Sequence, residues 1–339
     1  MMARRVTIVD VATRAGVSTA AASKVLRNAY GVSDQMRERV EKAIQDLGYR
    51  PLAAARGMRG KTFTIGVLVS DMQNPFFGVL IEGVSAEVEA SGYELLVGPA
   101  GAGARSQSRM VDAMVDRQMD GLILISPMFD DESLARTARL VPTVVIGRHG
   151  PAEAYDTVAN DDIAGSGLIV DHLVSLGHTR IGYLGHADPE ESDPRLPQQV
   201  RERGYREAMV RHGLGEHIDV VPGRWTNGGG RAGARDLLAR RIRPTAIHGG
   251  ADVAALGVLT ELIEKGVSVP GDMSVVGYDN TTTATLPQIS LTSVDQSGSE
   301  MGRMAARLLL ERFEGRTDSQ HFLTAPHLVA RRTSGVPSS

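Results

Sequence analysis

The sequence predicts a small helical domain at the N-terminus, followed by an α/β body of two similar lobes. Capping residues and glycines divide roughly the first fifty residues into three short helices. From Thr64 onward, runs rich in valine, isoleucine and leucine alternate with helical stretches. Such runs are typical of parallel strands whose two faces are both covered by helices. Because the body is long for one sheet, we expect it to form two lobes.

The first two helices form a helix-turn-helix pattern. Apolar residues recur at helical spacing over Ile8–Ala15, where Thr7 stands at the N-cap position and Gly16 ends the helix. A second helix is predicted over about Thr19–Leu26, with Ser18 as its cap. In such a motif the second helix fits the major groove of DNA. A helical hairpin at the edge of a larger core would have the same pattern.

A third helix and a linker complete the N-terminal part. Ser33 caps this helix, whose apolar stripe extends to Leu47 before Gly48 stops it. Pro51 then breaks the helical pattern, and the segment after it has no apolar face to bury, so we expect a linker that orders as a hinge helix only on binding. The predicted divisions are a helix-turn-helix DNA-binding domain at 1–50, a hinge at 51–61 and a body at 62–339, with one lobe at about 62–161 and 292–322 and the other at about 162–291 and 323–336.

Charge is distributed unevenly along the chain. Residues 1–61 hold 12 Lys and Arg against 5 Asp and Glu, a net charge of +7, while the remaining 278 residues hold 25 against 35, a net charge of −10. A basic head on an acidic body suits a polyanionic partner for the head alone. The absence of cysteine excludes disulfides, thiolate catalysis and zinc–cysteine sites. We find neither an apolar run of eighteen residues nor a secretory signal, and therefore expect a cytoplasmic protein without a membrane segment.

Eight segments in this order resemble the lactose-repressor (LacI/GalR) family, and the resemblance covers essentially the whole chain. They are VTIVDVATRAGVS at 6–18, VSDQMRERVEKAIQDLGYRP at 32–51, NPFF at 74–77, LVSLGHTRIGYLG at 173–185, ADVAALGVL at 251–259, VPGDMSVVGYDN at 269–280, LTSVDQ at 291–296 and LVARRTSG at 328–335. The resemblance implies a homodimeric transcription regulator. Since repressors are the usual members of this family, we expect a repressor of carbohydrate-metabolism genes. Its body would have the type I fold of periplasmic binding proteins, and a small sugar-like effector between the lobes would switch its operator affinity.

The implied partners are a near-palindromic DNA operator, the effector and a second copy of the chain. A dimer with two-fold symmetry should bind two half-sites related by the same symmetry. The residues before Ser339 show no leucine heptads, which favours a dimer over a tetramer.

The resemblance also implies the DNA contacts. Thr19, Ala20 and Lys24 take the positions that face base edges, where Lys24 can donate to O6 and N7 of a guanine and the other two offer methyl groups to thymine. The hinge matches the minor-groove segment of the family, where Met58 would wedge between base pairs. Hydroxyl groups suit phosphate oxygens. The predicted DNA-contacting residues are Thr7, Ser18, Thr19, Ala20, Ser23, Lys24, Ser33, Ala55 and Met58.

Effector contacts are expected beyond the carboxyl ends of the strands, where ligands of doubly wound folds bind. Aromatic rings there can stack on a sugar face, and arginines can donate paired hydrogen bonds. The predicted residues are Asn74, Phe76, Phe77, Arg148, Asp161, Arg201, Trp225, Asp252, Asp279 and Gln296.

Two positions depart from the pattern of the sugar-binding members. Gly147 stands where they often have aspartate, and Ala251 stands where the family usually has asparagine. Each departure removes a partner for a hydroxyl group. The ligand is therefore open between a neutral monosaccharide and a phosphorylated, acidic, deoxy or nucleobase-containing compound. The cationic side chains of Arg148 and Arg201 favour an anionic group.

Other classes of protein are weaker interpretations. The sequence has no GxxxxGK[ST] phosphate loop and no GxSxG nucleophile elbow, so we expect no enzyme, and we predict no cofactor. His172 and His178 are not spaced to share a metal on one helix, and we predict no metal site. Three alternatives stay open: a sugar-binding or nucleoside-binding protein that does not act on DNA, a regulator with a non-sugar effector, and an activator. Residues 1–60 distinguish the first of these from a regulator.

Overall fold

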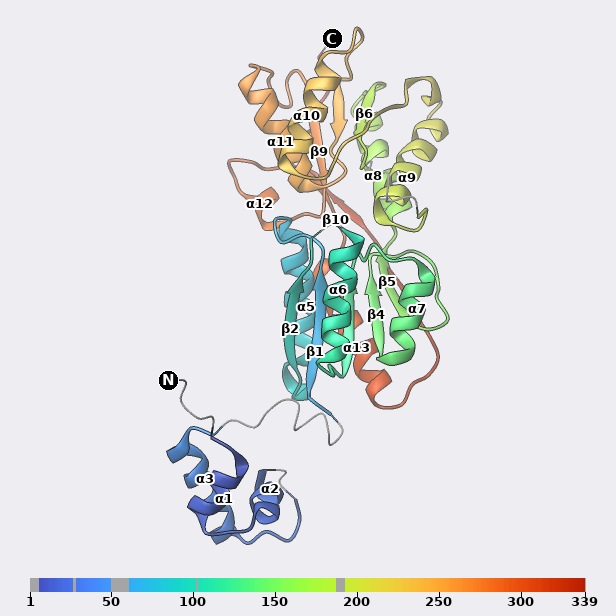
Figure 1. The fold of residues 1–339 in the computed structure, drawn as a ribbon. Coiled ribbons are helices and arrows are strands. Elements are labelled where there is room, and N and C mark those ends of the chain that lie inside the picture. Colours follow the sequence, from blue (N-terminus) through green and yellow to red (C-terminus); the bar gives the residue numbers. More distant parts are fainter. Residues whose placement is uncertain (1–5, 27–28, 50–60, 102, 187–192, 339) are drawn as a thin grey trace. The chain divides into compact units, whose positions relative to one another are not determined.

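The computed structural model describes residues 6–26, 29–49, 61–101, 103–186 and 193–338. The chain divides into two compact units between Thr62 and Phe63. The first unit is helical, and the second holds two β-sheets with their covering helices. Figure 1 shows the order of these elements along the chain.

The N-terminal unit contains the three predicted helices, α1 (Ile8–Ala15), α2 (Thr19–Leu26) and α3 (Asp34–Leu47). Thr7 and Asp10 form a reciprocal capping box at the start of α1. The glycines that end α1 and α3 have φ of 64° and 60°, a left-handed conformation that favours glycine. Val11, Ala22 and Val40, one from each helix, are completely buried in a shared apolar core. The prediction of these helices and their caps is confirmed.

The first lobe of the second unit is built on a parallel sheet in the order β11-β5-β4-β3-β1-β2. Its strands are β1 (Thr64–Val69), β2 (Glu94–Pro99), β3 (Gly121–Ile125), β4 (Thr143–Ile146), β5 (Asp156–Asn160) and β11 (His321–Thr324). One face is covered by α5 (Pro75–Val88) and α13 (Gly298–Phe313), and the other by α6 (Ala104–Asp116) and α7 (Asp131–Leu140). A short 3-10 helix, η1 (Glu89–Ser91), follows α5.

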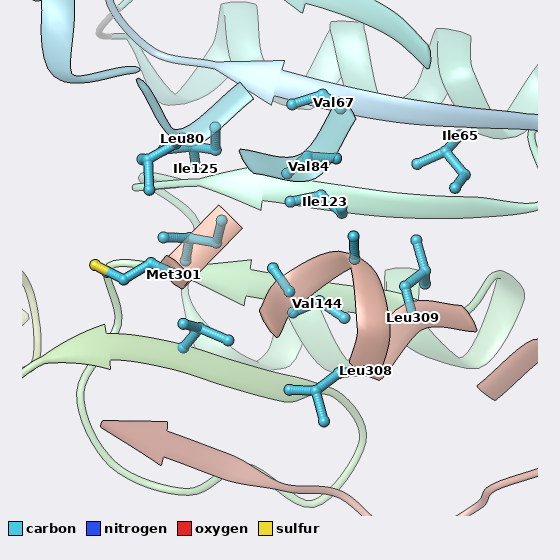
Figure 2. Close-up of a cluster of buried hydrophobic side chains, with 14 of the residues drawn as sticks. Ile65, Val67, Leu80, Val84, Ile123, Ile125, Val144, Met301, Leu308 and Leu309 are labelled. Carbon is cyan, nitrogen blue, oxygen red and sulfur yellow. The ribbon is translucent and has the colours of Figure 1, made fainter. Parts of the chain in front are cut away.

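Both faces of this sheet are apolar because alternate side chains point to opposite sides. On β1, Val67 belongs to the core beneath α5 and α13, whereas Leu68 belongs to the core beneath α6 and α7. Figure 2 shows side chains of β1, β3 and β4 meeting those of α5 and α13, including Leu80 and Leu309. The near-continuous apolar strands of the sequence therefore reflect a sheet buried on both faces.

The second lobe is built on a sheet in the order β12-β10-β9-β8-β6-β7, which is parallel except for β12. Its strands are β6 (Ile181–Leu184), β7 (Asp219–Val221), β8 (Ala246–His248), β9 (Ser274–Tyr278), β10 (Thr292–Asp295) and β12 (His327–Val329). One face is covered by α8 (Asp162–Ser175) and α9 (Pro197–Arg211), and the other by α10 (Asn227–Leu238) and α11 (Asp252–Glu264). The remaining short elements are η2 (Gly215–His217) and α12 (Thr282–Thr285).

The later crossings between the lobes differ from the predicted boundaries at 292 and 323. Thr292 pairs with Val276, so β10 belongs to the second sheet and the chain crosses only after Asp295. His321 pairs with Thr157, so β11 still belongs to the first sheet. The predicted boundaries were wrong here because the sheet to which β10 and β11 belong depends on their pairing with strands elsewhere in the chain, which a local pattern does not show.

Glycines set the close approach of α10 and α11 in the second lobe. A Cβ atom on Gly230 would lie 1.9 Å from the carbonyl oxygen of Ala254, and one on Gly257 would lie 2.1 Å from that of Asn227. Backbone meets backbone at both points, so no side-chain rotation could make room. The two helices can pack at this distance only with glycine in both places.

The substitution Gly230→Ala should therefore destabilise the protein, while Gly228→Ala should not. Overpacking costs about 1–3 kcal/mol, which corresponds to a fall in Tm of about 2–10 °C for a unit of this size. Gly228 is on the same helix but has open space around its Cβ position, and alanine there should leave Tm unchanged or raise it slightly. Thermal unfolding followed by circular dichroism measures both variants, and equal shifts in the two would contradict this account of the packing.

Candidate functional site

The second helix of the N-terminal unit presents three of the predicted DNA-contacting residues to solvent. Thr19, Ala20 and Lys24 on α2 are all exposed. Ser23 is not, since only 7% of it is accessible and it lies among the buried residues of the helix. The prediction that Ser23 reaches a phosphate therefore finds no support in its placement. The exposed base-facing positions fit insertion of α2 into a groove.

The other predicted phosphate contacts are hydroxyl groups at helix N-termini. The hydroxyl oxygen of Thr7 accepts from the backbone N–H of Asp10 at 3.4 Å, that of Ser18 from Ala21 at 3.1 Å, and that of Ser33 from Met36 at 3.3 Å. All three caps are exposed, at the ends of helices whose free N–H groups attract anions. Ala55 and Met58 lie outside the described residues.

A cavity of about 360 Å³ opens between the lobes of the second unit. It lies at the carboxyl ends of the strands, where we predicted the effector contacts from the sequence. We call it the interlobe cavity. Seven of the predicted effector residues line it, namely Asn74, Phe76, Phe77, Arg201, Trp225, Asp279 and Gln296.

Arg201 lies deep in the wall of the interlobe cavity and is already neutralised. Its Nε donates to Asp162 Oδ1 at 2.9 Å, and its Nη1 donates to the carbonyl oxygen of Gly250 at 3.0 Å. The guanidinium carbon lies 3.8 Å from the ring centroid of Tyr278 and 4.9 Å from that of Trp225. These contacts hold Arg201 in one position and leave it little charge for a ligand.

Asp162 carries the charge that balances Arg201. Burial would raise the pKa of this carboxyl, but the charge of Arg201 and hydrogen bonds from His149 and Tyr278 outweigh burial and lower the pKa to about 2. His149 Nε2 lies 2.8 Å from Asp162 Oδ2 and comes from the first lobe, just after β4. Asp162 is therefore ionised at neutral pH and joins the two lobes at the cavity wall.

Asp279 offers the interlobe cavity an unused acceptor. Its Oδ1 accepts from Gln296 Nε2 at 2.5 Å and lies 3.6 Å from Arg201 Nη1. Within the described part of the chain, its Oδ2 is buried without a hydrogen-bond partner. Burial raises the pKa of Asp279 to about 8. The charge of Arg201 and side-chain hydrogen bonds from Gln296 and Asn74 oppose this rise, and the charge of Asp252 adds to it. A ligand that donates a hydrogen bond to Oδ2 would satisfy this atom.

Three predicted effector residues do not line the interlobe cavity. Arg148 is 1% exposed and binds the carboxylates of Asp131 and Asp193. Asp161 is the N-cap of α8, where its Oδ1 accepts from the backbone N–H of Ala164 at 3.0 Å. In each case a local partner occupies the polar group that was expected to meet a ligand.

Asp252, the third of these residues, braces a turn. Its Oδ2 accepts from the backbone N–H and hydroxyl of Thr281 at 2.7 and 2.9 Å, and its Oδ1 accepts from the hydroxyl of Ser293 at 2.6 Å. This turn follows Asp279, which has a φ of 118°. Asp252 therefore positions Asp279 rather than facing the cavity.

Asp162, which was not among the predicted effector residues, lines the cavity in place of Asp161. Two adjacent aspartates at a helix start have different roles, because the N-cap side chain turns back to the backbone while the next side chain points inward. The sequence showed both carboxylates, and the capping rule could have assigned Asp161 to the helix end.

The absence of aspartate at position 147 has a structural reason. Gly147 lines the cavity with a φ of 78°, and a Cβ atom there would lie 2.7 Å from Ser126 Oγ. Glycine avoids both the strain and the clash. The chain therefore lacks an acceptor at this point of the first lobe.

Comparisons with known proteins agree with the two-unit architecture. Residues 7–51 match the family model of bacterial regulatory proteins of the lacI family, and residues 170–334 match that of a periplasmic binding protein-like domain. The chain is 33% identical over 315 residues to the HTH-type transcriptional repressor CytR of Escherichia coli strain K12, covering 91% of this chain and 90% of the relative. It is 32% identical over 333 residues to the ribose operon repressor of the same strain, covering 97% and 99%.

A solved structure has the same fold over nearly the whole chain. This is the crystal structure of the lac repressor dimer bound to operator and the anti-inducer ONPF. It matches with a TM-score of 0.82 and 26% sequence identity, and the match covers 98% of this chain and 100% of that one.

The raised pKa of Asp279 predicts a pH-dependent difference between the wild type and Asp279→Asn. The unfolded carboxyl ionises near its ordinary pKa of 3.8, whereas the folded one holds its proton up to about pH 8. Asp279 therefore contributes stability at low pH that is lost as the pH rises through this window. Because asparagine does not titrate, the Tm of the variant relative to wild type should rise by about 2 °C or more per pH unit between pH 5 and 8.

Melting curves at several pH values measure this difference, with Asp130→Asn as the control. The pKa of Asp130 is lowered from its ordinary value of 3.8, chiefly by a hydrogen bond from the backbone of Ser133, so this carboxyl is ionised in both the folded and the unfolded chain from pH 5 to 8. The Tm difference between Asp130→Asn and wild type should therefore be constant from pH 5 to 8. A constant Tm difference for Asp279→Asn as well would show that Asp279 is already ionised across this pH range.

Proposed function

Since the chain belongs to the lacI family of bacterial regulatory proteins, we propose that its interlobe cavity binds a small, uncharged, sugar-like effector that switches operator affinity. Members of this family are DNA-binding transcriptional repressors, and the chain is accordingly a transcriptional regulator and not an enzyme. The proposed effector binds between the lobes and acts on the helix-turn-helix unit through the same chain.

We infer the class of effector mainly from the buried Oδ2 atom of Asp279. An unsatisfied buried acceptor costs about 1–3 kcal/mol, which a donating hydroxyl group of a ligand would recover. Phe76, Phe77 and Trp225 give the same cavity apolar surfaces for the faces of a sugar or nucleobase ring. The name of one relative, the ribose operon repressor, supports a sugar-like ligand.

The charge of the interlobe cavity argues against the anionic ligand that the sequence favoured. Arg148 is outside the cavity, and Arg201 is paired with Asp162. Arg224 also lines the cavity but is exposed, so solvent screens its charge. A phosphate or carboxylate group would instead meet the ionised carboxylate of Asp162.

The proposed DNA partner is a near-palindromic operator bound by a homodimer. The matched lac repressor structure is a dimer on its operator. In this chain, exposed apolar side chains on β2 and α11 offer surface for self-association, since Leu96 is 50%, Val97 39% and Ile263 74% accessible. In such a dimer Lys24 of each copy would read one half-site.

We also propose that the protein acts in the cytoplasm, where its DNA target is found. This placement rests on the DNA-binding roles of the relatives. Among the described residues, no helix is long and apolar enough to cross a membrane.

A ligand panel tests the effector class. It contains pentoses, hexoses and nucleosides, each beside its phosphate ester or acid form, and it is read by Tm and by Trp225 fluorescence. A ligand at 100 times its Kd adds about 2.7 kcal/mol of apparent stability, so a true effector raises Tm clearly. We expect the responding compound to be uncharged and its phosphate ester to be weaker. If no compound of the panel changed Tm or Trp225 fluorescence, this result would contradict a sugar-like effector.

Substitution of Lys24 tests the assignment of α2 to base recognition. On an operator obtained by in vitro selection, Lys24→Ala should weaken binding by about 1–3 kcal/mol while affecting random DNA much less. Lys42→Ala is the matched control, because Lys42 is equally exposed but lies on α3. Fluorescence anisotropy measures both variants. Equal losses on selected and random DNA would assign Lys24 to the phosphate backbone.

A further inference from the structure

Four charged side chains form an alternating ring that joins the two lobes. Asp131 and Arg148 come from the first lobe, on α7 and just after β4. Asp193 and Arg195 come from the second lobe, in the segment between β6 and α9. We call these four residues the interlobe clasp.

Each arginine of the interlobe clasp binds both aspartates. Arg195 Nη1 lies 2.5 Å from Asp131 Oδ2, and Arg195 Nη2 lies 2.9 Å from Asp193 Oδ2. Arg148 Nη2 lies 3.1 Å from Asp131 Oδ1 and also binds Asp193 Oδ2. Two of these ion pairs, Arg195–Asp131 and Arg148–Asp193, cross from one lobe to the other. A ring held by four pairs restrains its side chains more than an isolated surface pair does.

Burial makes Arg148 the centre of the interlobe clasp. Its side chain is 2% accessible, whereas those of Asp193, Arg195 and Asp131 are 24%, 34% and 50% accessible. Arg148 also donates to the carbonyl oxygen of Phe129 at 3.1 Å, inside its own lobe. When the lobes part, this buried cation loses Asp193, one of its two counter-ions. Separation therefore carries a large electrostatic cost at Arg148.

The interlobe clasp adjoins the interlobe cavity without lining it. Gly147, directly before Arg148, and Pro197, two residues after Arg195, both line the cavity. Between them, the backbone N–H of His149 donates to the carbonyl oxygen of Arg195 at 3.0 Å. Residues 147–149 and 195–197 thus meet across the cavity, and each of these segments carries one arginine of the clasp. The distance between them sets how far the cavity is closed.

We infer that Arg148 is a positioning residue, which holds the two lobes closed over the interlobe cavity through the clasp and so sets effector affinity without touching the effector. The inference rests on the proposed function only in naming the cavity's ligand an effector. Closure itself can be measured without any ligand.

The fluorescence of Trp225 can report whether the interlobe cavity is open or closed. It is the single tryptophan of the chain. Its ring lines the interlobe cavity and its Nε1 donates to the carbonyl oxygen of Leu184 at 3.0 Å, which fixes it in the wall of the second lobe. Opening of the cavity would expose this ring to a dissolved quencher.

The experiment compares acrylamide quenching of Trp225 in the wild type, Asp131→Asn, Asp193→Asn and the double variant. Each single variant should raise the quenching constant by about twofold or more, because loss of the clasp shifts the population toward the open state. The double variant should give the largest quenching constant. Asp131→Asn removes the interlobe pair with Arg195, Asp193→Asn removes the one with Arg148, and only the double variant removes both. Far-UV circular dichroism and a cooperative melt establish that each variant is folded.

Asp171→Asn is the matched control. Its side chain is 45% accessible and binds Arg211 and His212, so it resembles Asp131 in exposure and pairing, but all three residues lie in the second lobe. Its quenching constant should equal that of wild type. Equal constants for Asp131→Asn and Asp171→Asn would overturn the inference, as would a double variant that is quenched no more than wild type.

Salt gives a second test that needs no new variant. At 1 M NaCl the screening length falls to about 3 Å, which weakens the partly exposed pairs of the clasp. The quenching constant of wild type should then rise toward that of the double variant, whose own value should change little because it lacks both interlobe pairs. A wild-type constant independent of salt would contradict an electrostatic clasp. Neither test depends on the identity of the effector, so failure here is distinct from a silent ligand panel.

Discussion

The buried ion pair between Arg201 and Asp162 determines what the interlobe cavity can bind. The side chains are only 5% and 2% accessible, so each charge depends on the other for compensation. Removing one partner of such a pair costs about 3–5 kcal/mol, which fixes both in place. With Arg201 neutralised, Asp279 becomes the group that meets a ligand. His149 adds a bond from the first lobe to Asp162, so closure of the lobes and the charge of the cavity wall are coupled.

The parts of the fold that could be predicted from the sequence are those with local causes. In the N-terminal unit, caps at Thr7 and Ser33 and left-handed glycines at 16 and 48 define the helix ends within the segment itself. The longer strands could also be predicted, because their runs of valine, isoleucine and leucine are visible in the sequence. The pattern of apolar residues does not predict β5, β7, β11, β12, α7 or α13 as separate elements. Short edge strands such as β12 are stabilised by a partner distant in sequence, which a local pattern does not show.

The sequence predicted the location of the cavity and the types of residue that line it better than it predicted the role of each residue. Phe76, Trp225, Asp279 and Gln296 line the cavity as expected, because the ends of parallel strands converge at one edge. Arg148 was misassigned because its two carboxylate partners come from α7 and from a segment of the other lobe. Pairings of this kind depend on tertiary structure. They also reverse the expected charge of the ligand, since both predicted cations are neutralised by carboxylates.

The central claim, that an uncharged effector donates a hydrogen bond to Asp279, is tested most directly by counting protons released on binding. Burial raises the pKa of the Asp279 carboxyl to about 8, so this carboxyl is mostly protonated at pH 7. A hydroxyl group that donates to Oδ2 stabilises the ionised form and expels that proton. Titration calorimetry of the compound that raises Tm most, in buffers of different ionisation enthalpy, measures this number. The account predicts a release close to one proton per site at pH 7, whereas no release, or uptake, would contradict it.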